Sequence, residues 1–462
     1  MNDVTLPPRS PRALYTARWV LPIAAEPIAH GAVLVEGERI AWVGSERESP
    51  LGSDANLEHV SLDDAVLMPG LVNAHSHLEL TGLRGFLEGL DFREWLRTLT
   101  VVRQELLSEQ DLLDASRLGI VEALRHGITT LADCTDSAQP IRALRELGVR
   151  GIGYVEVFGP DPAQRDGAIA RLKERVATLR RDDTSLVRTG VSPHAPYTVS
   201  AALFRATADY ARAEQLPMAV HVAESAAETA FVCHGTGPFA ERLRARGIAV
   251  APQARSPVAF LDATGVLAAQ PLLIHVVRAD DDDLARIAHH GASIVHCPIS
   301  NAKLGQGIAP LDRMLAHDIA TGLGTDSVAS NDRMHLIDEV RQAILFHSVR
   351  SGVPDSLSAH AALALATRGS ATALGLGGEI GTLEVGKAAD LAAFPLDDVQ
   401  PVFDPAVSLV HALAGRALAS LVVVAGRVLV RSGRVQVELA EWRERQRVTS
   451  DRLREWRQHG PS

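Results

Sequence analysis

The stretch MPGLVNAHSHLEL, residues 68–80, carries two histidines separated by one residue, His75 and His77. Side chains alternate between the two faces of a β-strand, so a strand through this stretch places both imidazoles on one face. Two imidazoles at one strand end are two of the three or four ligands that a zinc ion needs. The pair alone does not establish a metal site, because close histidines also occur by chance in a chain with 18 of them. Further ligands must come from the rest of the chain.

Length and composition limit the class of protein. The chain has 462 residues, of which 46% are apolar, and this suits a large α/β domain with an accessory domain. The net charge of −10 argues against a nucleic-acid or anionic-membrane partner.

Targeting signals and cysteine usage favour a cytoplasmic protein. No apolar run is long enough to span a membrane, and the first residues lack the apolar core of a secretory signal. The three cysteines have no close spacing, which argues against a disulfide framework or a cysteine zinc site. A reducing cytoplasm is therefore the expected location.

The pattern of apolar residues divides the chain into four parts. β-like sequence fills residues 1–69 and returns over 375–440. Strand-like and helix-like runs alternate over 70–374, which is typical of parallel strands with crossover helices. Residues 441–462 form a charged helix, expected to be a solvated face or a packing arm. The economical arrangement is one small β-sandwich made from both termini, with the α/β part inserted between them.

Eight strand-like runs occur in the α/β part if the stretch with His75 and His77 is the first. The other seven are GITTLADC, RGIGYVEVFG, VRTGVSP, PMAVHVAES, PLLIHVV, ASIVHCPIS and IATGLGTD. The helix-like runs are DLLDASRLGIVEALRH, PIRALREL, AIARLKERVATLR, ALFRATADYARAEQ and DDDLARIAHH. Eight parallel strands favour a closed, TIM-like (β/α)8 barrel over an open sheet.

In such a barrel, the chemistry lies at the C-terminal ends of the strands. The metal-binding and acid–base residues found there are His75, His77, His194, His221, Glu224, His275 and Asp326. Each one alone has an ordinary explanation as a polar residue of a surface loop. That explanation is poor for five of eight strand ends, because imidazole and charged groups beside apolar runs need partners.

Six motifs resemble those of the amidohydrolase superfamily. They are PGLVNAHSHLELTGLRG, SPHAPYT, HVAES, IVHCPISNAKLGQGIAPLDRML, GLGTDSVASN and GTLEVGKAADL. They are similar to the branch that contains methylthioadenosine/S-adenosylhomocysteine deaminases, aminofutalosine deaminases, guanine deaminases and triazine hydrolases. The motifs span nearly the whole chain and are specific for this branch, but they do not specify the substrate.

The resemblance implies one zinc ion per chain, with iron as the alternative. The implied ligands are His75, His77, His221 and Asp326. The resemblance also implies that Glu224 carries protons, that His275 holds and polarises the attacking water, and that His194 contacts an adenosine-like substrate. Oligomers are common in families of this kind, so a homodimer is expected.

This set of residues suits hydrolysis of a carbon–nitrogen bond in a cyclic amidine. A zinc ion lowers the pKa of bound water toward ~7, and Asp326 can both ligate and accept the water's proton. Attack moves charge onto a ring nitrogen, which Glu224 is expected to protonate before it helps ammonia leave. The superfamily's binuclear alternative needs a carboxylated lysine after strand four. The three lysines, Lys173, Lys303 and Lys387, lie elsewhere, so a binuclear site is disfavoured.

Three further residues each have two explanations. Glu79 and Arg84 either face the substrate mouth or pack in a loop, and Trp95 either caps the pocket or belongs to the core. The long interval between His221 and His275 predicts an insert that covers the pocket.

The sequence therefore predicts a metal-dependent deaminase of an aminated heterocycle, a small molecule. The leading candidates for the substrate are adenosine-like: aminofutalosine, methylthioadenosine or S-adenosylhomocysteine. The alternatives are a guanine-, pterin- or triazine-type aminohydrolase or chlorohydrolase, and a cyclic amide or imidazolone hydrolase. A metal-bearing scaffold is the non-enzymatic alternative, and the presence of Glu224 argues against it.

Overall fold

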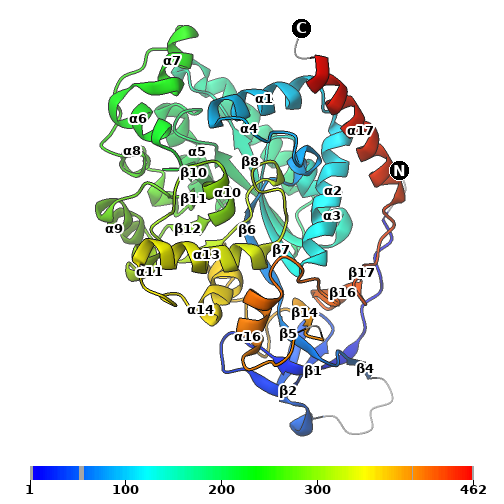
Figure 1. Cartoon of the computed structure of the whole chain (residues 1–462). Coiled ribbons are helices and arrows are strands. Elements are labelled where there is room, and N and C mark those ends of the chain that lie inside the picture. The colour runs from blue at the N-terminus through cyan, green and yellow to red at the C-terminus, as the bar shows by residue number, and fades with distance from the viewer. Residues whose placement is uncertain (1–3, 51–56, 398, 460–462) are drawn as a thin grey trace.

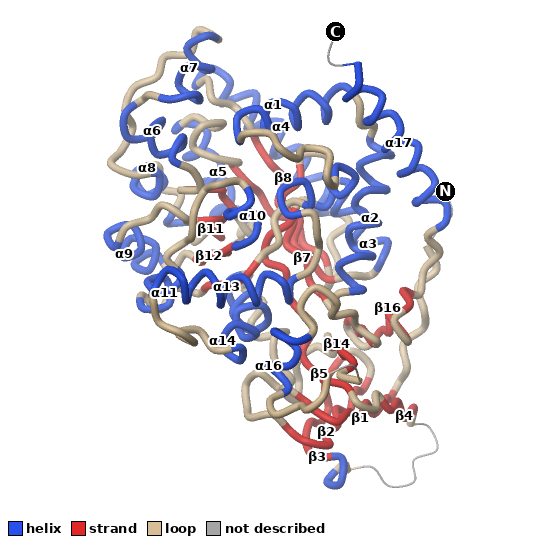
Figure 2. The backbone as a smooth tube through the Cα atoms, in the orientation of Figure 1, coloured by secondary structure: helices blue, strands red, loops and turns tan. Residues whose placement is uncertain are grey.

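Strands from both ends of the chain pair in one nine-stranded sheet, which we call the terminal sheet (Figures 1 and 2). The computed structural model describes residues 4–50, 57–397 and 399–459, so parts of the predicted ranges 1–69, 375–440 and 441–462 lie outside the described residues. The N-terminal strands are β1 (Arg12–Val20), β2 (Ile28–Glu36), β3 (Arg39–Ser45), β4 (Glu58–Ser61) and β5 (Ala65–Pro69). The C-terminal strands are β14 (Leu391–Pro395), β15 (Leu421–Val424), β16 (Arg427–Arg431) and β17 (Arg434–Val435).

Antiparallel pairing of β5 with β14 joins the two ends of the chain. The strand order is β17-β16-β15-β14-β5-β1-β2-β3, with β4 beside β1. Leu391 pairs with Pro69, and Pro395 pairs with Ala65. Both termini thus build one β region, as expected, and their strands pair as a single sheet. Two helical turns that the sequence did not predict, α16 (Pro405–Val407) and the π-helix η6 (Ser408–Ala412), lie between β14 and β15.

Eight parallel strands form the α/β part, in two sheets of four. The first sheet contains β6 (Leu71–Ser76), β7 (Ile128–Thr135), β8 (Arg150–Val157) and β9 (Val187–Pro193). The second contains β10 (Ala219–Val222), β11 (Leu272–His275), β12 (Ser293–His296) and β13 (Thr321–Leu323). Isolated parallel bridges join Val191 to Met218 and Ser76 to Asp326. The eight predicted strands are confirmed, and the second bridge brings the C-terminal ends of the first and the last together.

The five predicted helices are also confirmed. They are α2 (Glu109–Arg125), α3 (Gln139–Leu147), α4 (Arg165–Arg180), α5 (Ala201–Glu214) and α9 (Asp281–His290). Capping boxes explain where two of them begin. The Ser108 hydroxyl accepts a hydrogen bond from the backbone N–H of Asp111 in α2, and Asp280 accepts one from Asp283 in α9.

The other helices lie in the connections and at the C-terminal end. They are α1 (Phe92–Glu105), α6 (Ala226–His234), α7 (Gly237–Ala245), α8 (Pro257–Ala263), α10 (Pro298–Lys303), α11 (Leu311–Ala316), α12 (Val328–Asn331), α13 (Leu336–Ser351), α14 (Ala359–Ala364), α15 (Ser370–Ala373) and α17 (Ala440–His459). Shorter segments are η1 (Glu46–Glu48), η2 (Leu78–Leu83), η3 (Pro162–Gln164), η4 (Leu267–Ala269) and the π-helix η5 (Leu365–Gly369). Helices α6, α7 and α8 form the predicted insert between β10 and β11. Within the described ranges, no helix is long and apolar enough to cross a membrane.

Helix α17 lies along α2 on the outside of the α/β part (Figure 1). Arg445 of α17 donates to both carboxylate oxygens of Asp114, through Nε at 2.5 Å and Nη2 at 2.9 Å. Leu453 packs in the same apolar cluster as Trp95. The C-terminal helix is therefore a packing arm, one of the two forms expected for it.

Alternate residues of β8 point into an interior cluster between the parallel strands. Ile152 and Tyr154 pack there with Cys134 of β7, whereas Val155 packs in the outer core beneath the helices. Because side chains alternate along a strand, the next inward position is Glu156, one residue before β8 ends. A carboxyl group thus stands where the apolar interior gives way to the C-terminal ends of the strands.

A buried ion pair ties the start of β8 to the terminal sheet. Arg150 donates to Asp390 through Nε at 2.7 Å and Nη2 at 3.2 Å, and both side chains are at most 5% exposed. The same Asp390 carboxylate accepts the backbone N–H of Ala425 at 2.8 Å. Three segments distant in sequence therefore meet at one carboxylate.

Replacing Asp390 with alanine should lower the free energy of unfolding by about 3–5 kcal/mol, because Arg150 would be left buried without its main partner. The measurement is the midpoint of urea denaturation. Asp209→Ala is the matched control, since Asp209 pairs with Arg212 on an exposed helix surface and should change stability by less than about 1 kcal/mol. Equal midpoints for the two variants would contradict this role for Asp390.

Candidate active site

The predicted site residues lie at or just beyond the C-terminal ends of the parallel strands. His75 is near the end of β6, and His77 follows the strand directly at the start of η2. His221 lies in β10, and His275 is the last residue of β11. Asp326 follows β13, and its backbone N–H donates to the carbonyl oxygen of His75 at 3.0 Å. The β-bridge between Ser76 and Asp326, which joins the first and last parallel strands, therefore lies within the site.

The four residues expected to hold a metal converge. The Asp326 Oδ1 atom lies 3.1 Å from His75 Nε2 and 3.6 Å from His77 Nε2. The ring centre of His75 lies 4.8 Å from that of His77 and 5.0 Å from that of His221. Three imidazoles and one carboxylate therefore lie close together, and these are the donor types that zinc takes in hydrolytic enzymes.

The hydrogen bonds of two imidazoles leave one ring nitrogen of each available to a metal. His77 Nδ1 lies 2.9 Å from the carbonyl oxygen of Cys134, and His221 Nδ1 lies 3.2 Å from that of His194. Carbonyl oxygens only accept, so both Nδ1 atoms donate and both Nε2 atoms keep a lone pair. Such hydrogen bonds fix the tautomer and orientation of metal-binding histidines, and these residues therefore fit a zinc ion.

Burial sets the protonation of this group. Desolvation lowers the pKa of His75 to about 4, against the opposing effect of Asp326, and it lowers the pKa of His77 and His221 as well. Burial alone would raise the pKa of Asp326, but its hydrogen bond to His75 and its electrostatic interactions with His75, His275 and His77 hold that pKa well below its usual range. Neutral imidazoles beside an ionised carboxylate are the protonation states that metal ligation requires.

Two serine hydroxyls orient the Asp326 carboxylate. Ser300 donates to Oδ2 at 2.5 Å and Ser330 donates to the same oxygen at 3.1 Å. These contacts occupy Oδ2, so Oδ1 is the oxygen left facing the histidines. From the sequence, turn chemistry explains Ser300 as well as binding does, and nothing singles out Ser330.

Glu224 and His275 lie together beside the metal-binding group. The Glu224 Oε1 atom lies 3.9 Å from His275 Nε2. His275 Nδ1 lies 2.9 Å from Asn301 Oδ1, which only accepts, so His275 donates there and keeps a lone pair on Nε2. Burial, reinforced by the charge of Asp326, raises the pKa of Glu224 to about 8. Glu224 therefore carries a proton near neutral pH in this environment.

Glu228, which the sequence did not single out, fixes the backbone at Glu224. Its carboxylate accepts the backbone N–H of Ala223 at 2.9 Å and that of Glu224 at 2.8 Å. Ala223 has a φ of +52°, and His275 and Asp326 have φ values of +76° and +58°. Left-handed conformations are strained for residues with a side chain, and such strain collects at functional sites. Here it occurs at or beside three of the strand ends.

His194 lies next to His221, directly after β9. The two ring centres are 4.8 Å apart, and the ring of Tyr197 lies 6.0 Å from His194. Phe239 of α7 stacks on Tyr197 with 4.0 Å between ring centres. The insert therefore reaches this side of the site through an aromatic pair.

Glu79, Arg84 and Trp95 are bound mainly by protein groups. Glu79 is buried, accepts from Thr135 Oγ1 at 2.9 Å and pairs with Arg103 Nη2 at 2.6 Å. Arg84 pairs with Glu122, and Trp95 is core, donating to the carbonyl oxygen of Ala329 at 3.3 Å. These contacts favour the packing explanation over substrate contact for all three.

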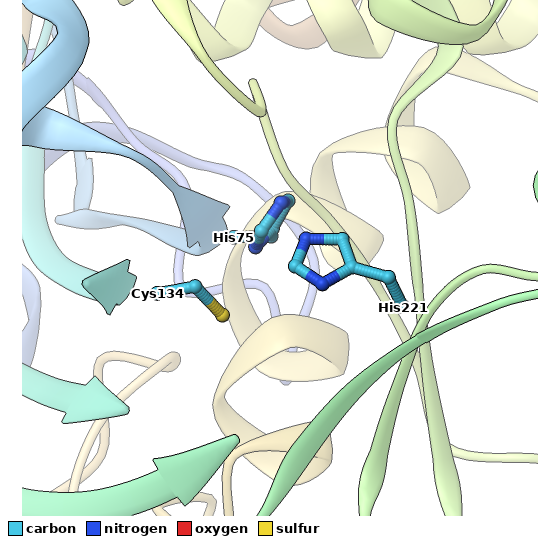
Figure 3. A group of neighbouring side chains, drawn as sticks. All are labelled: His75, Cys134 and His221. Atoms are coloured by element: carbon cyan, nitrogen blue, oxygen red, sulfur yellow. The ribbon is translucent and has the colours of Figure 1, made fainter. Parts of the chain in front are cut away.

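The thiol of Cys134 is a third type of metal donor near the site, besides the imidazoles and the Asp326 carboxylate. Figure 3 shows its sulfur and the rings of His75 and His221 facing a shared space from separate strands, and donor atoms of the three lie within 4.8 Å of one another. Burial, followed by the charges of Glu156 and Asp133, raises the pKa of the Cys134 thiol well above its usual range. Donor atoms of His75, His275 and Asp326 also lie within 4.8 Å of one another, so a thiol and a carboxylate both approach His75.

Glu156 is a further buried site carboxyl that the sequence did not single out. Burial raises its pKa to about 8, with Arg103 opposing the rise. The sequence contains a sign of this buried carboxyl in the run RGIGYVEVFG, where a charged residue interrupts apolar sequence near a strand end. The run contains no imidazole and lies outside the metal-binding motifs, so the sequence pattern alone does not connect this carboxyl with the site.

Known proteins similar to this chain include one matching family model and two deaminases of the same name. A model of the amidohydrolase family matches residues 66–429. The chain is 33% identical over 410 residues to a 5-methylthioadenosine/S-adenosylhomocysteine deaminase of Nitratidesulfovibrio vulgaris strain Hildenborough, covering 88% of each protein. It is 30% identical over 428 residues to the deaminase of the same name from Moorella thermoacetica, covering 91% of this chain and 95% of the relative.

Solved structures match over almost the whole chain. An adenosine deaminase from Xanthomonas campestris with bound zinc has a TM-score of 0.85 and 29% identity, covering 97% of this chain and 100% of that one. A zinc complex of atrazine chlorohydrolase from Arthrobacter aurescens has a TM-score of 0.80 and 25% identity, covering 95% and 100%.

Replacing His77 or Asp326 with alanine should remove stoichiometric zinc, because each change takes away one converging donor. Zinc bound after dialysis, measured by mass spectrometry, checks this. Cys134→Ser is the matched control and should keep its zinc. Loss of zinc in Cys134→Ser, with retention in Asp326→Ala, would assign the fourth ligand to the cysteine.

Proposed function

The chain belongs to the amidohydrolase family, and we propose that it is a metal-dependent aminohydrolase that releases the exocyclic amino group of an adenosine-like nucleoside as ammonia. The observation that supports the proposal most directly is the position of His75 and His77, whose Nε2 atoms lie 3.1 and 3.6 Å from Asp326 Oδ1, together with the buried Glu224 carboxyl beside His275. Ligands for a metal and a proton donor for a leaving amine thus lie in one place.

His75, His77, His221 and Asp326 would hold one zinc ion, with iron(II) as the alternative. When bound, zinc supplies the Lewis acidity that makes water nucleophilic at neutral pH. Asp326 remains ionised and can accept a proton on Oδ1, since Oδ2 is occupied by two hydroxyls. His275 Nε2 can accept a hydrogen bond from the attacking water, because the proton of the neutral ring is on Nδ1, which donates to Asn301 Oδ1.

Glu224 would protonate the substrate. A carboxyl with a raised pKa donates a proton near neutral pH, and a ring nitrogen of a cyclic amidine gains basicity as the nucleophile adds. Glu228 holds the backbone of Glu224 in position for that transfer. The same carboxyl, once ionised, can take a proton from the added oxygen and return it to the departing amine. The products are ammonia and the keto form of the ring.

Two findings support an adenosine-like substrate: the names of the relatives, and the rings of His194, Tyr197 and Phe239 on one side of the site. All three deaminases described above act, by name, on adenosine or its derivatives. His194 lies beside His221, with 4.8 Å between the ring centres. The chlorohydrolase neighbour supports a triazine as the second candidate. Chloride release, in place of ammonia, would identify that alternative.

We also infer that the two parallel sheets close into one (β/α)8 barrel over residues 70–374. The two bridges between the sheets support closure, as does the backbone bond from His221 N–H to the His194 carbonyl oxygen at 2.9 Å. Residues 1–69 and 375–440 would make the sandwich by folding the terminal sheet over a core that draws on β1, β2, β14 and β15. A homodimer is the expected assembly.

Replacing Glu224 with glutamine should lower kcat about 100- to 10,000-fold, the usual contribution of a positioned acid–base group. A coupled ammonia assay on adenosine, 5-methylthioadenosine and S-adenosylhomocysteine measures this. Zinc content should be unchanged, because Glu224 is not among the proposed ligands. Glu214→Gln, an exposed glutamate of α5, is the matched control and should retain full activity. Unimpaired turnover by Glu224→Gln would exclude the proposed proton transfer.

A further inference from the structure

Glu339, in the first turn of α13, is a fully buried carboxyl outside the group of residues that would hold the metal. Its exposed fraction is 0%, and no cationic side chain pairs with it in the described part of the chain. Burying a carboxyl is costly unless hydrogen bonds satisfy it, so an apolar residue would suit this position better for packing alone. The groups that bind Glu339 therefore indicate what it does.

Two N–H groups from different segments satisfy the Glu339 carboxyl. Its Oε2 atom accepts the backbone N–H of Ile299 in α10 at 3.0 Å, and its Oε1 atom accepts from the side-chain amide of Asn331 in α12. Burial raises the pKa of Glu339 well above its usual range, and both hydrogen bonds oppose that rise. Because each oxygen serves a separate donor, this carboxyl connects α10, α12 and α13 at one point.

The hydrogen bond to Ile299 positions Ser300, the next residue of α10. The Ser300 hydroxyl donates to Asp326 Oδ2 at 2.5 Å. A serine side chain is short, so its hydroxyl reaches Oδ2 only while the backbone at the start of α10 stays in place. Glu339 therefore acts on one oxygen of the Asp326 carboxylate through the backbone beside Ser300.

The hydrogen bond to Asn331 positions the peptide group that leads into Asp326. The same Asn331 Nδ2 atom donates to the Thr325 carbonyl oxygen at 2.7 Å. That carbonyl shares a planar peptide group with the N–H of Asp326, which donates to the His75 carbonyl oxygen at 3.0 Å. The peptide group is thus held at both ends. Asp326 itself has a φ of +58°, a strained conformation that persists only where surrounding groups enforce it.

We propose that Glu339 is a positioning residue that directs the Asp326 carboxylate toward the metal-binding histidines, acting through Ser300 and through the Thr325 peptide group. This inference rests on the proposed function, and it places control of one metal ligand in a helix outside the parallel strands. Groups that orient a metal ligand from behind usually change metal affinity or activity by about 10- to 100-fold when they are replaced.

Stabilisation of α13 alone is the competing explanation. An acidic residue in the first turn of a helix is favourable in general, because it lies near the positive end of the helix dipole. Asp338 lies in the same turn, where it pairs with Arg333 at 2.6 Å and accepts the backbone N–H of Gly415 at 2.7 Å. These partners of Asp338 lie outside α10 and α12, so a change at Asp338 disturbs α13 without loosening the two supports of Asp326.

The test measures zinc affinity and turnover in Glu339→Gln. A glutamine amide has one acceptor and one donor end, so whichever way it turns, one N–H of Ile299 or Asn331 would face another N–H. We expect the zinc dissociation constant, measured by competition with a chromogenic chelator, to rise about 10- to 100-fold. With zinc at saturation, ammonia release from adenosine should show a lower kcat and little change in KM, because no contact with substrate is removed.

Asp338→Asn is the matched control, and we expect it to lower the midpoint of urea denaturation while leaving the zinc dissociation constant and kcat unchanged. Asn331→Ala removes the bond to the Thr325 carbonyl oxygen and leaves the bond to Ile299. It should therefore weaken zinc binding in the same direction as Glu339→Gln, by a smaller factor. This second variant tests the proposal even if Glu339→Gln does not fold.

The possible results separate this inference from the proposed function. Wild-type zinc affinity and kcat in Glu339→Gln or in Asn331→Ala would overturn the positioning role. Equal weakening of zinc binding in Glu339→Gln and Asp338→Asn would trace the effect to α13 as a whole and would also overturn it. If the wild type binds zinc but deaminates no nucleoside, the proposed function fails while the zinc affinities still decide the role of Glu339. If the wild type binds no zinc, both fail.

Discussion

Two hydrogen bonds between His75 and Asp326, residues 251 positions apart, join the first and last parallel strands at the metal-binding group. The backbone N–H of Asp326 donates to the His75 carbonyl oxygen at 3.0 Å, and the side chains meet at 3.1 Å. The first bond joins the first parallel strand to the last, and the second brings a carboxylate to the histidine pair. Because one pair of residues does both, the strands cannot separate at this seam without dispersing the donors. Fold and site depend on the same contact.

The sequence predicted the parallel strands and the converging histidines because both follow from short-range rules. Strand ends in an α/β protein lie on one side, so His221, His275 and Asp326 could be grouped with His75 without coordinates. Other features depend on distances that no local pattern encodes. The pairing of β5 with β14, the packing of Trp95 in the core, and the position of Cys134 opposite two imidazoles all arise from segments far apart in the sequence. Glu79 and Arg84 were uncertain for the same reason, since their partners Arg103 and Glu122 belong to other elements.

Exclusion of water determines how the site's titratable groups behave. It keeps the imidazoles neutral and raises the pKa of Glu224 and of Glu156 to about 8. Neighbouring groups then distinguish these carboxyls from Asp326, whose pKa is held well below its usual range, against burial, by its hydrogen bond to His75 and its interactions with the nearby histidines. One pocket thus contains both acceptors and donors of protons. The left-handed backbone at Ala223, His275 and Asp326 costs about 1–3 kcal/mol for each residue, and the surrounding buried hydrogen bonds maintain it.

The β5–β14 pairing also imposes an order of assembly during translation. β5 leaves the ribosome before any of the parallel strands, whereas its partner β14 is made after all of them. Until then β5 presents an open, wholly apolar edge, and such edges promote intermolecular pairing. The nascent chain therefore has a long interval in which chaperones must protect this edge. A chain that ended between β13 and β14 would contain all the parallel strands yet keep the unpaired edge of β5, and we expect it to aggregate through that edge.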